Sequence, residues 1–228
     1  SPDGSMLAVA ETGNHAIRLI DLATGEVSTI AGTGRQGRER EGGPALETDL
    51  ASPWDLLWRD DGIWIAMAGW HQIWRLDPDA GTIEPVAGTG AESIHDGPLA
   101  EATFAQPSGI TAVNGVFYIA DSETSAVRSI DPAADRVQRL VGRGLFHFGD
   151  IDARGDSVRL QHPLGVTAGR DGVRTIYLAD SYNNKIKELH PVNRSVITIF
   201  GTGDAGRDDG DADEATFWEP GGLSLAGG

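Results

Sequence analysis

The chain has 228 residues, of which 39% are hydrophobic and 23% charged, a composition typical of a folded globular protein and not of a disordered tail. It contains no cysteine, which excludes disulfides, thiol catalysis and thiolate zinc sites. Its longest apolar run, residues 63–70, is far shorter than the ~20 residues that cross a bilayer. The 18 basic and 34 acidic residues give a formal net charge of −16, so we expect neither nucleic acid nor a membrane as partner, whereas a cationic partner is electrostatically favoured.

Four segments of the chain align as an internal repeat. Each contains a short β-prone run that ends in alanine, and a glycine follows 22 positions after that alanine in all four segments. A proline comes 19 or 21 positions after each glycine. The alanines are Ala10, Ala66, Ala120 and Ala179, the glycines Gly32, Gly88, Gly142 and Gly201, and the prolines Pro53, Pro107, Pro163 and Pro220. This regular spacing predicts four copies of one structural unit.

Each unit predicts four short strands, because β-branched and aromatic residues alternate with turn clusters and no long stretch carries a helical period. In chain order, the first unit has strands at residues 7–10, 16–21 and 27–31. Each unit after it begins with a strand that follows the proline, as at residues 109–113, and the last predicted strand covers residues 222–225. Four-stranded units with a period slightly above the ~40–50 residues of known blades predict an all-β protein, a β-propeller with about four four-stranded blades. The expected blade units are 1–52, 53–106, 107–162 and 163–219, followed by a final strand in 220–228.

The connections between the strands are expected to divide between two faces, because strand direction alternates within an antiparallel blade. One face should hold the long loops from each glycine to the next proline together with the turns between the second and third strands. The loops are residues 32–52, 88–106, 142–162 and 201–219, and the turns contain His15, His71, Ser125 and Asn184. We call this the loop face and expect the functional surface there, because loops carry most binding functions. The four alanines are expected to be buried in equivalent second strands, where small side chains allow close packing.

The turns carry a motif that resembles the NHL repeat, Ala-Asp-x-x-Asn-His-x-Ile. Residues 179–186 read Ala-Asp-Ser-Tyr-Asn-Asn-Lys-Ile, residues 120–122 begin in the same way, and residues 11–17 have Glu in place of Asp. Residues 67–73 lack both the Asp and the Asn. The resemblance to the NHL repeat family implies a six-bladed propeller, of which this chain holds about four blades, and a thioredoxin-like domain upstream in a longer protein. It implies binding or scaffolding and supplies no catalytic residue in the propeller.

The two ends of the chain lead to two further expectations. The chain begins at Ser1 rather than at Met, so we expect that the natural start is missing, and the compartment is left open with the cytoplasm as the default. The blade interfaces are expected to suit a ring of six, and close-packed interfaces resist repacking into a ring of four. We therefore predict an open arc in which residues 222–225 do not pair with residues 7–10.

Two glycine-rich segments match GxGxxG, at residues 32–37 and 201–206. A dinucleotide site requires a helix that begins there, whereas acidic, turn-rich loops follow both segments. We therefore interpret them as repeat turns and expect no cofactor. His15 and His71 occupy equivalent turns, but the other two equivalents are Ser125 and Asn184, so this position cannot supply three histidines to a metal. Turn histidines that bond to the backbone are the expectation.

Two carboxylates, Asp121 and Asp180, begin turns of the loop face. A carboxylate at this position can accept backbone N–H bonds and stabilise a tight turn. General acid–base chemistry is the alternative, and it requires a partner with a shifted pKa. We favour the turn role for both residues.

Aromatic residues and histidines in the loops and turns form a candidate interaction face. Trp is common in binding hot spots, and exposed loop aromatics indicate interaction. The candidates are Trp54, Trp70, His71, Phe146, His147, Phe148 and Trp218. Packing between blades is the alternative role for the tryptophans, because Trp is usually buried.

The leading hypothesis is a non-enzymatic propeller scaffold that binds a protein or peptide through the loop face. A metal-dependent propeller hydrolase or lyase is the alternative, and sugar or lactone binding is also left open. An enzyme of this class needs polar side chains where the first strand of several blades begins. These positions are Trp54-Asp55, Ser108-Gly109, Leu164-Gly165 and Gly221-Gly222, which are mostly small or apolar.

Overall fold

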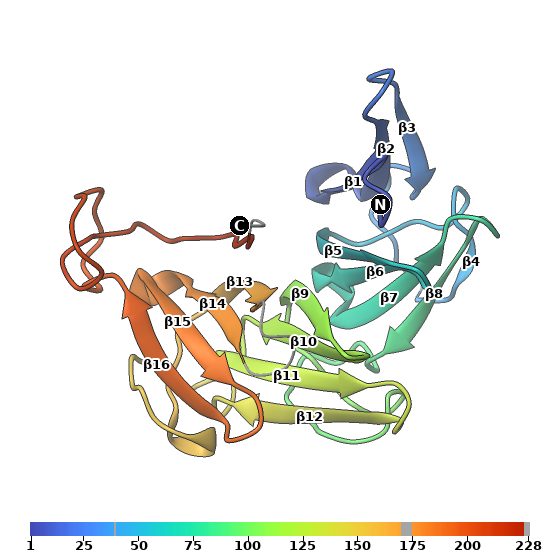
Figure 1. Cartoon of the computed structure of the whole chain (residues 1–228). Helices are drawn as coiled ribbons and strands as arrows, with labels where there is room; N and C mark the ends of the chain where they lie inside the picture. The colour runs from blue at the N-terminus through green and yellow to red at the C-terminus, as the bar shows by residue number, and fades with distance from the viewer. Residues whose placement is uncertain (39, 170–174, 226–228) are drawn as a thin grey trace.

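The computed structural model describes residues 1–38, 40–169 and 175–225, and its strands form four small antiparallel sheets arranged as the blades of a β-propeller (Figure 1). The first blade contains β1 (Met6–Glu11), β2 (Ala16–Asp21) and β3 (Val27–Ala31). The second contains β5 (Pro53–Arg59), β6 (Gly62–Met67), β7 (Gln72–Asp77) and β8 (Thr82–Ala87), with the two-residue β4 (Gly43–Pro44) added to β8. The third contains β9 (Pro107–Val113), β10 (Val116–Asp121), β11 (Ala126–Asp131) and β12 (Arg136–Val141), and the fourth contains β13 (Pro163–Ala168), β14 (Ile176–Asp180), β15 (Lys185–His190) and β16 (Ser195–Phe200). Short 3-10 turns are η1 (Thr12–Asn14), η2 (Ala68–Trp70), η3 (Gly155–Ser157) and η4 (Ser181–Asn183).

Strand register explains the constant spacing of the repeat. In the third blade Ala120 pairs with Val127 across β10 and β11, and Val127 pairs with Val141 across a bulge between β11 and β12. Gly142 follows directly with φ +88°, and a Cβ on it would lie 2.5 Å from the carbonyl oxygen of Ser125. The corresponding pairs and glycines occur in the other three blades. The 22-residue distance is therefore the length of two paired strands plus a close backbone approach that only glycine tolerates.

Hydrophobic cores fill the interfaces between neighbouring blades. Between the second and third blades, the rings of Trp64 and Phe117 lie 4.0 Å apart and Phe104 from the preceding loop is fully buried. The prediction of buried alanines is confirmed for Ala66, Ala120 and Ala179, which are 0% exposed. Ala10 is only half-buried, which corrects that prediction. It lies in β1, which forms the edge of its sheet and lacks the inner strand that covers β6, β10 and β14.

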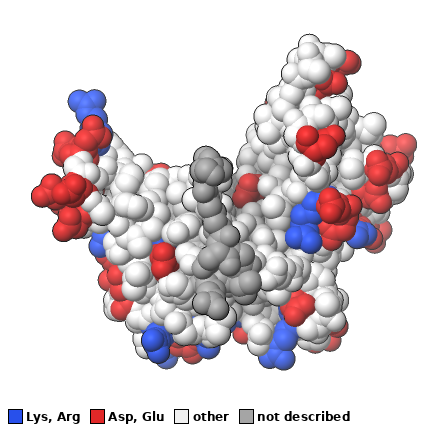
Figure 2. All heavy atoms as spheres, in the orientation of Figure 1, with Lys and Arg blue, Asp and Glu red and all other residues white. Residues whose placement is uncertain are grey.

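The C-terminal segment corrects one prediction and confirms another. Residues 222–225 form no strand, so the predicted final strand is wrong over the described part of its range, and residues 226–228 lie outside the described residues. A strand needs a hydrogen-bonded neighbour, and the described chain offers none to this segment. It does not pair with β1, so the blades form an open arc as predicted (Figure 1). Figure 2 shows a hollow in the surface between the two ends of this arc.

The long loops begin and end at the turns of the loop face, but their middle parts leave it. Gly43 of β4 pairs with Ile83 of β8, and Gly97 forms a bridge with Val137 of β12. These bonds lie on the outermost strand of the following blade, whose edge would otherwise be unpaired. The expectation that the loops lie wholly on one face is therefore wrong, because the edge strands β8, β12 and β16 offer them hydrogen-bond partners.

Candidate functional site

Asp121 and Asp180 end the second strands of their blades, and their side chains are fully buried. Each accepts a backbone N–H at 2.7 Å, Asp121 from Ala105 and Asp180 from Gln161. The predicted role as acceptor is confirmed, although the donor belongs to the long loop that precedes the strand and not to the turn itself. Burial raises the pKa of both carboxyls to about 6, against the opposing effects of these hydrogen bonds and of nearby cations.

The nearby cations are Arg128 and Lys187, which are also fully buried and were not predicted from the sequence. Arg128 contacts Asp121 at 3.3 Å and Asp96 at 2.8 Å, and Lys187 contacts Asp150 at 2.6 Å. The repeat alignment could have identified these two cations, because both lie eight positions after the strand alanine. Arg18 and Trp74 occupy the equivalent positions in the first two blades. In the second blade buried Met67 and Trp74 replace the ion pair, so apolar packing fills this position there.

Hydroxyl groups tie the turns to the next inner strand. Ser122 donates to the carbonyl of Pro163 at 2.8 Å, and Ser181 donates to the carbonyl of Pro220 at 2.7 Å. Thr12 makes the same bond to Pro53 at 2.7 Å. The equivalent residue of the second blade is Ala68, which has no hydroxyl. The residue after the turn carboxylate thus joins one blade to the next in three of the four units.

The turn histidines bond to the backbone, as predicted. His15 and His71 have positive φ, and the Nδ1 atom of each accepts an N–H at 3.0 Å, from Ser52 and Gln106 respectively. Ser125 and Asn184 accept the equivalent N–H groups at 3.3 and 2.9 Å. Burial lowers the pKa of His71, against the opposing charge of Glu92. These histidines therefore position loops.

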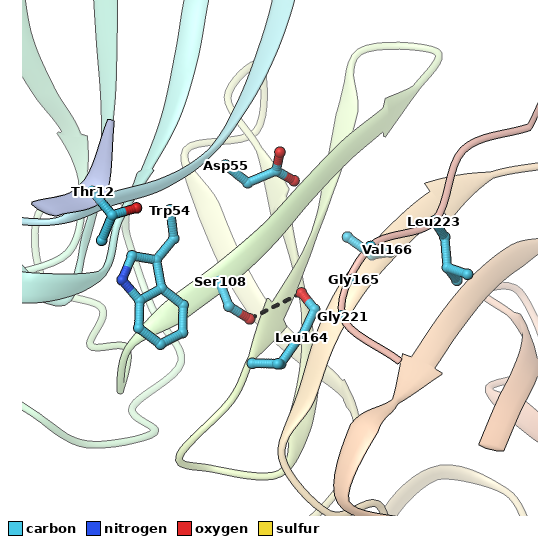
Figure 3. Close-up of a pocket in the computed structure, with 10 residues that line it drawn as sticks. Thr12, Trp54, Asp55, Ser108, Leu164, Gly165, Val166, Gly221 and Leu223 are labelled. Atoms are coloured by element: carbon cyan, nitrogen blue, oxygen red, sulfur yellow. Dashed lines mark hydrogen bonds between the residues drawn. The ribbon is translucent and has the colours of Figure 1, made fainter. Parts of the chain in front are cut away.

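The strand beginnings singled out in the sequence converge on an axial cavity of about 460 Å³ (Figure 3). Trp54 and Asp55 begin β5, Ser108 begins β9, and residues 164–166 begin β13. Residues 221–223 and Thr12 complete the wall. The cavity opens where the loops and turns meet the inner strands, and Trp54 is 38% exposed in it. The sequence analysis named these positions only as those that an enzyme would need to be polar, and it did not predict a cavity at them.

Asp55 is the acidic residue of this wall, and it stands where the third blade has a glycine. The equivalent residue of the third blade is Gly109, where a Cβ would lie 2.4 Å from the carbonyl oxygen of Leu164. Asp55 instead spans the junction between β5 and β9, because one carboxylate oxygen accepts the N–H of Ile110 at 2.9 Å. Burial raises the pKa of Asp55, against the opposing hydrogen bonds from Ile110 and Leu56.

The remaining aromatic candidates divide into exposed and buried groups. Phe146 is 86% exposed, His147 and Phe148 are exposed, and all three belong to the loop 142–162. Phe148 lines a pocket of about 200 Å³ in which the rings of His162 and Tyr182 stack 4.5 Å apart.

Two tryptophans of the candidate face have structural explanations. Trp70 is 3% exposed and packs against Trp74 with ring centroids 4.8 Å apart, so the packing alternative applies to it. Trp218 is 74% exposed. Its repeat equivalents include Ala51 and Ala105, whose carbonyls accept N–H bonds from the following turn, and no such turn follows Trp218 in the described chain.

Other site types find little support among the described residues. The glycine-rich segments open loops and not helices, which confirms the turn interpretation of GxGxxG. No group of three or more His, Cys, Asp or Glu side chains that could hold a metal occurs in the described ranges. The described part of the chain also contains no helix with the length and apolar character needed to cross a membrane.

The blades and their turn motif define a β-propeller of the NHL repeat type. The chain is 40% identical over 261 residues to NHL repeat-containing protein 2 of Homo sapiens, a match that covers 99% of this chain and 36% of that protein. It is 43% identical over 233 residues to the protein SUPPRESSOR OF QUENCHING 1, chloroplastic, of Arabidopsis thaliana, covering 97% of this chain and 22% of that protein. The resemblance to NHL repeat proteins is therefore confirmed. The chain spans about a third of the length of the first of these relatives and less than a quarter of the second.

Comparison with solved structures supports the same fold. A solved protein of unknown function from Bacteroides thetaiotaomicron matches with a TM-score of 0.63 at 20% identity, covering 84% of this chain and 43% of that one. No family model matches the chain.

Proposed function

We propose that this propeller is a non-enzymatic scaffold that binds a protein or peptide through its loop face. The axial cavity carries this proposal, because it is a concave site whose wall combines an exposed Trp with a small number of polar groups. Such a combination is typical of sites that accept an anchoring side chain. The thioredoxin-like domain that the family resemblance implies would place this propeller within a longer protein.

The exposed aromatics of loop 142–162 support the same proposal. Phe146 and Phe148 are exposed on this loop, and Phe148 lines a second recess together with Tyr182. Exposed aromatic groups of this kind are uncommon on surfaces without a partner. A peptide can contact both this recess and the axial cavity, whereas a small metabolite would use only one of them.

The charge of the chain favours a basic partner. The formal net charge is −16, and Figure 2 shows acidic side chains on the loop 201–219 and on the first blade. Complementary charge speeds encounter and fixes orientation more than it adds affinity. We therefore expect association with the partner to slow as the salt concentration rises.

The alternative of a metal-dependent hydrolase or lyase has less support at the axial cavity. The described wall supplies one carboxylate, Asp55, whose oxygens accept backbone N–H groups. It also supplies the hydroxyl of Ser108, which donates toward the carbonyls of the next inner strand, such as that of Leu164 at 3.0 Å. Glycine and apolar residues make up most of the remainder, so the binding hypothesis is favoured.

Peptide selection on the full chain tests the proposal. A random peptide library is selected on the protein, and the affinity of an enriched peptide is measured by titration calorimetry. We expect Trp54→Ala to weaken binding about tenfold or more, as for a hot-spot residue. Val192→Ala is the control, because Val192 is 83% exposed in the turn between β15 and β16, away from the loop face. Equal affinity for both variants would contradict the proposal.

A further inference from the structure

We propose that the partner group that enters the axial cavity is a basic side chain, with its charge beside Asp55 and its stem against Trp54. This inference rests on the proposed function and specifies the chemistry of the partner. It is carried by three observations: a half-buried carboxylate without a cation, a bulge that brings an aromatic residue to the same cavity, and open space in that cavity.

Asp55 differs from the carboxylates that end the second strands of the other blades. Glu11 pairs with Arg18, Asp121 pairs with Arg128, and Asp180 lies 3.8 Å from Lys187. Asp55 is half-buried, yet no Lys, Arg or His within residues 1–38, 40–169 and 175–225 forms an ion pair with it. Buried carboxylates are normally paired, because an isolated charge is costly to desolvate. A cation supplied by a partner would pair with this charge.

The hydrogen bonds of Asp55 leave room for such a cation. Its two oxygens accept one backbone N–H each, from Leu56 at 2.8 Å and from Ile110 at 2.9 Å. An ionised carboxylate has about four acceptor positions, so roughly two remain for a partner. The carboxylate lines the axial cavity, where a basic side chain can reach these positions (Figure 3).

A β-bulge brings Trp54 and Asp55 to the lining of the same cavity. Consecutive residues of a regular strand point to opposite faces, but the pairing of β5 with β6 shifts between Pro53 and Asp55. Trp54 and Asp55 therefore both line the same cavity. A cavity that holds both an aromatic ring and a carboxylate suits a long basic side chain, because its apolar stem can pack against the ring while its charge reaches the carboxylate.

The opposite wall leaves space for the incoming side chain. It includes Gly165 and Gly221 together with the side chains of Leu164, Val166 and Leu223, and Gly222 also lines the cavity. Glycines present no side chain to fill the cavity, and no cation lies on the described wall to repel a basic group. The cavity volume of about 460 Å³ is within the range of sites that accept ligand groups.

The alternative is that Asp55 has a purely structural role as a bridge between β5 and β9. The test must therefore depend on the charge of the probe. The probes are blocked pentapeptides, acetyl-Gly-Gly-X-Gly-Gly-amide, in which X is arginine, lysine or citrulline, the last a neutral isostere of arginine. Binding to the full chain is followed by the NMR shift of the Trp54 indole N–H, which is assigned with the Trp54→Phe variant. We expect the arginine and lysine probes to shift this signal at concentrations about tenfold lower than the citrulline probe.

Variants of the protein provide the second arm of the experiment. Asp55→Asn keeps an acceptor for the N–H of Ile110 and removes the charge, so it should weaken the basic probes about tenfold and leave the citrulline probe unchanged. Val192→Ala should change nothing. If the citrulline probe binds as well as arginine, the inference is overturned, even if Asp55→Asn fails to fold. In that case library peptides that depend on Trp54 would still support the proposed function, whereas the absence of any such peptide would remove the proposed function itself.

Discussion

The Nδ1 atom of His71 accepts the backbone N–H of Gln106 at 3.0 Å, and both residues have positive φ, 55° and 53°. His71 belongs to the turn of one blade, and Gln106 directly precedes the inner strand of the next. Two residues in an uncommon backbone conformation thus hold each other in place across a blade boundary. The same bond recurs at the other turns, with Asn184 as the acceptor in the fourth blade.

The effect of replacing His71 on stability should therefore depend on whether the new side chain can accept the N–H of Gln106. His71→Asn places the residue of the fourth blade in the second, where Asn tolerates positive φ and can accept the same N–H. We expect it to change the free energy of unfolding by less than about 1 kcal/mol, whereas His71→Ala should lower it by about 1–3 kcal/mol. Urea denaturation of both variants measures this difference, and equal losses for Asn and Ala would contradict it.

Comparison of the wild-type protein with His71→Asn also predicts a pH dependence. Burial lowers the pKa of His71 in the folded chain, so the unfolded chain binds the proton more readily. The stabilisation by neutral His71 is complete above the unfolded pKa of about 6.5 and is lost as the pH falls through the folded pKa. Between pH 7.5 and 5 the wild-type protein should lose more stability than His71→Asn. Identical pH profiles would show that protonation of His71 is not linked to folding.

The buried ion pair should be far more sensitive to substitution than its exposed equivalent. Arg128 and Asp121 are 0% exposed, whereas the side chains of Arg18 and Glu11 are each 34% exposed. Arg128→Met leaves a buried carboxylate without its cation and should lower the free energy of unfolding by about 3–5 kcal/mol. Arg18→Met, the matched control in the first blade, should lower it by about 0–1 kcal/mol. Similar losses at both positions, measured by urea denaturation, would refute this interpretation.

The repeat glycine should not tolerate a side chain. Gly142→Ala places a Cβ 2.5 Å from the carbonyl oxygen of Ser125 at φ +88° and should lower the free energy of unfolding by about 1–3 kcal/mol. A Cβ on Gly13 would meet no atom within 4 Å, and Gly13 has no positive φ, so Gly13→Ala is the control and should be neutral or slightly stabilising. Thermal denaturation separates the two, and an unchanged melting temperature for Gly142→Ala would contradict the backbone argument.

Enlarging the strand alanines should lower stability by an amount that depends on how deeply each is buried. Ala120→Leu adds volume to a fully buried position and should lower the free energy of unfolding by about 1–3 kcal/mol. Ala10 is half-buried in the edge strand β1, so Ala10→Leu should have a smaller effect. A denaturant titration in which Ala10→Leu is the more damaging change would disagree with the observed packing.

Regular spacing made the fold predictable from the sequence. The pairs Ala120–Val127 and Val127–Val141 fix the distance to Gly142, so a repeat search detects the register without coordinates. The structural role of the turn histidines His15 and His71 could be predicted because Ser and Asn replace them in the other two turns. The path of the loops could not be predicted, because the edge strands that bind them, such as β8 and β12, belong to other parts of the chain.

The candidate site was predictable only in part. Trp54 could be named from the sequence as a loop-face tryptophan, whereas Asp55 was not singled out, because the strand beginnings as a group are mostly small or apolar. The burial of Trp70 did not follow from its place in a turn, because its neighbour Trp74 occupies a position that carries a cation in the other three blades. The bridge from Asp55 to Ile110 depends on how closely two inner strands approach, which a single sequence does not contain.

A crystal structure of the full chain with a library-selected peptide tests the central proposal most directly. The proposal predicts that the peptide lies on the loop face, with one side chain in the axial cavity in contact with Trp54. A peptide bound at the turn between β15 and β16 or along a blade edge, with the axial cavity empty, would contradict it.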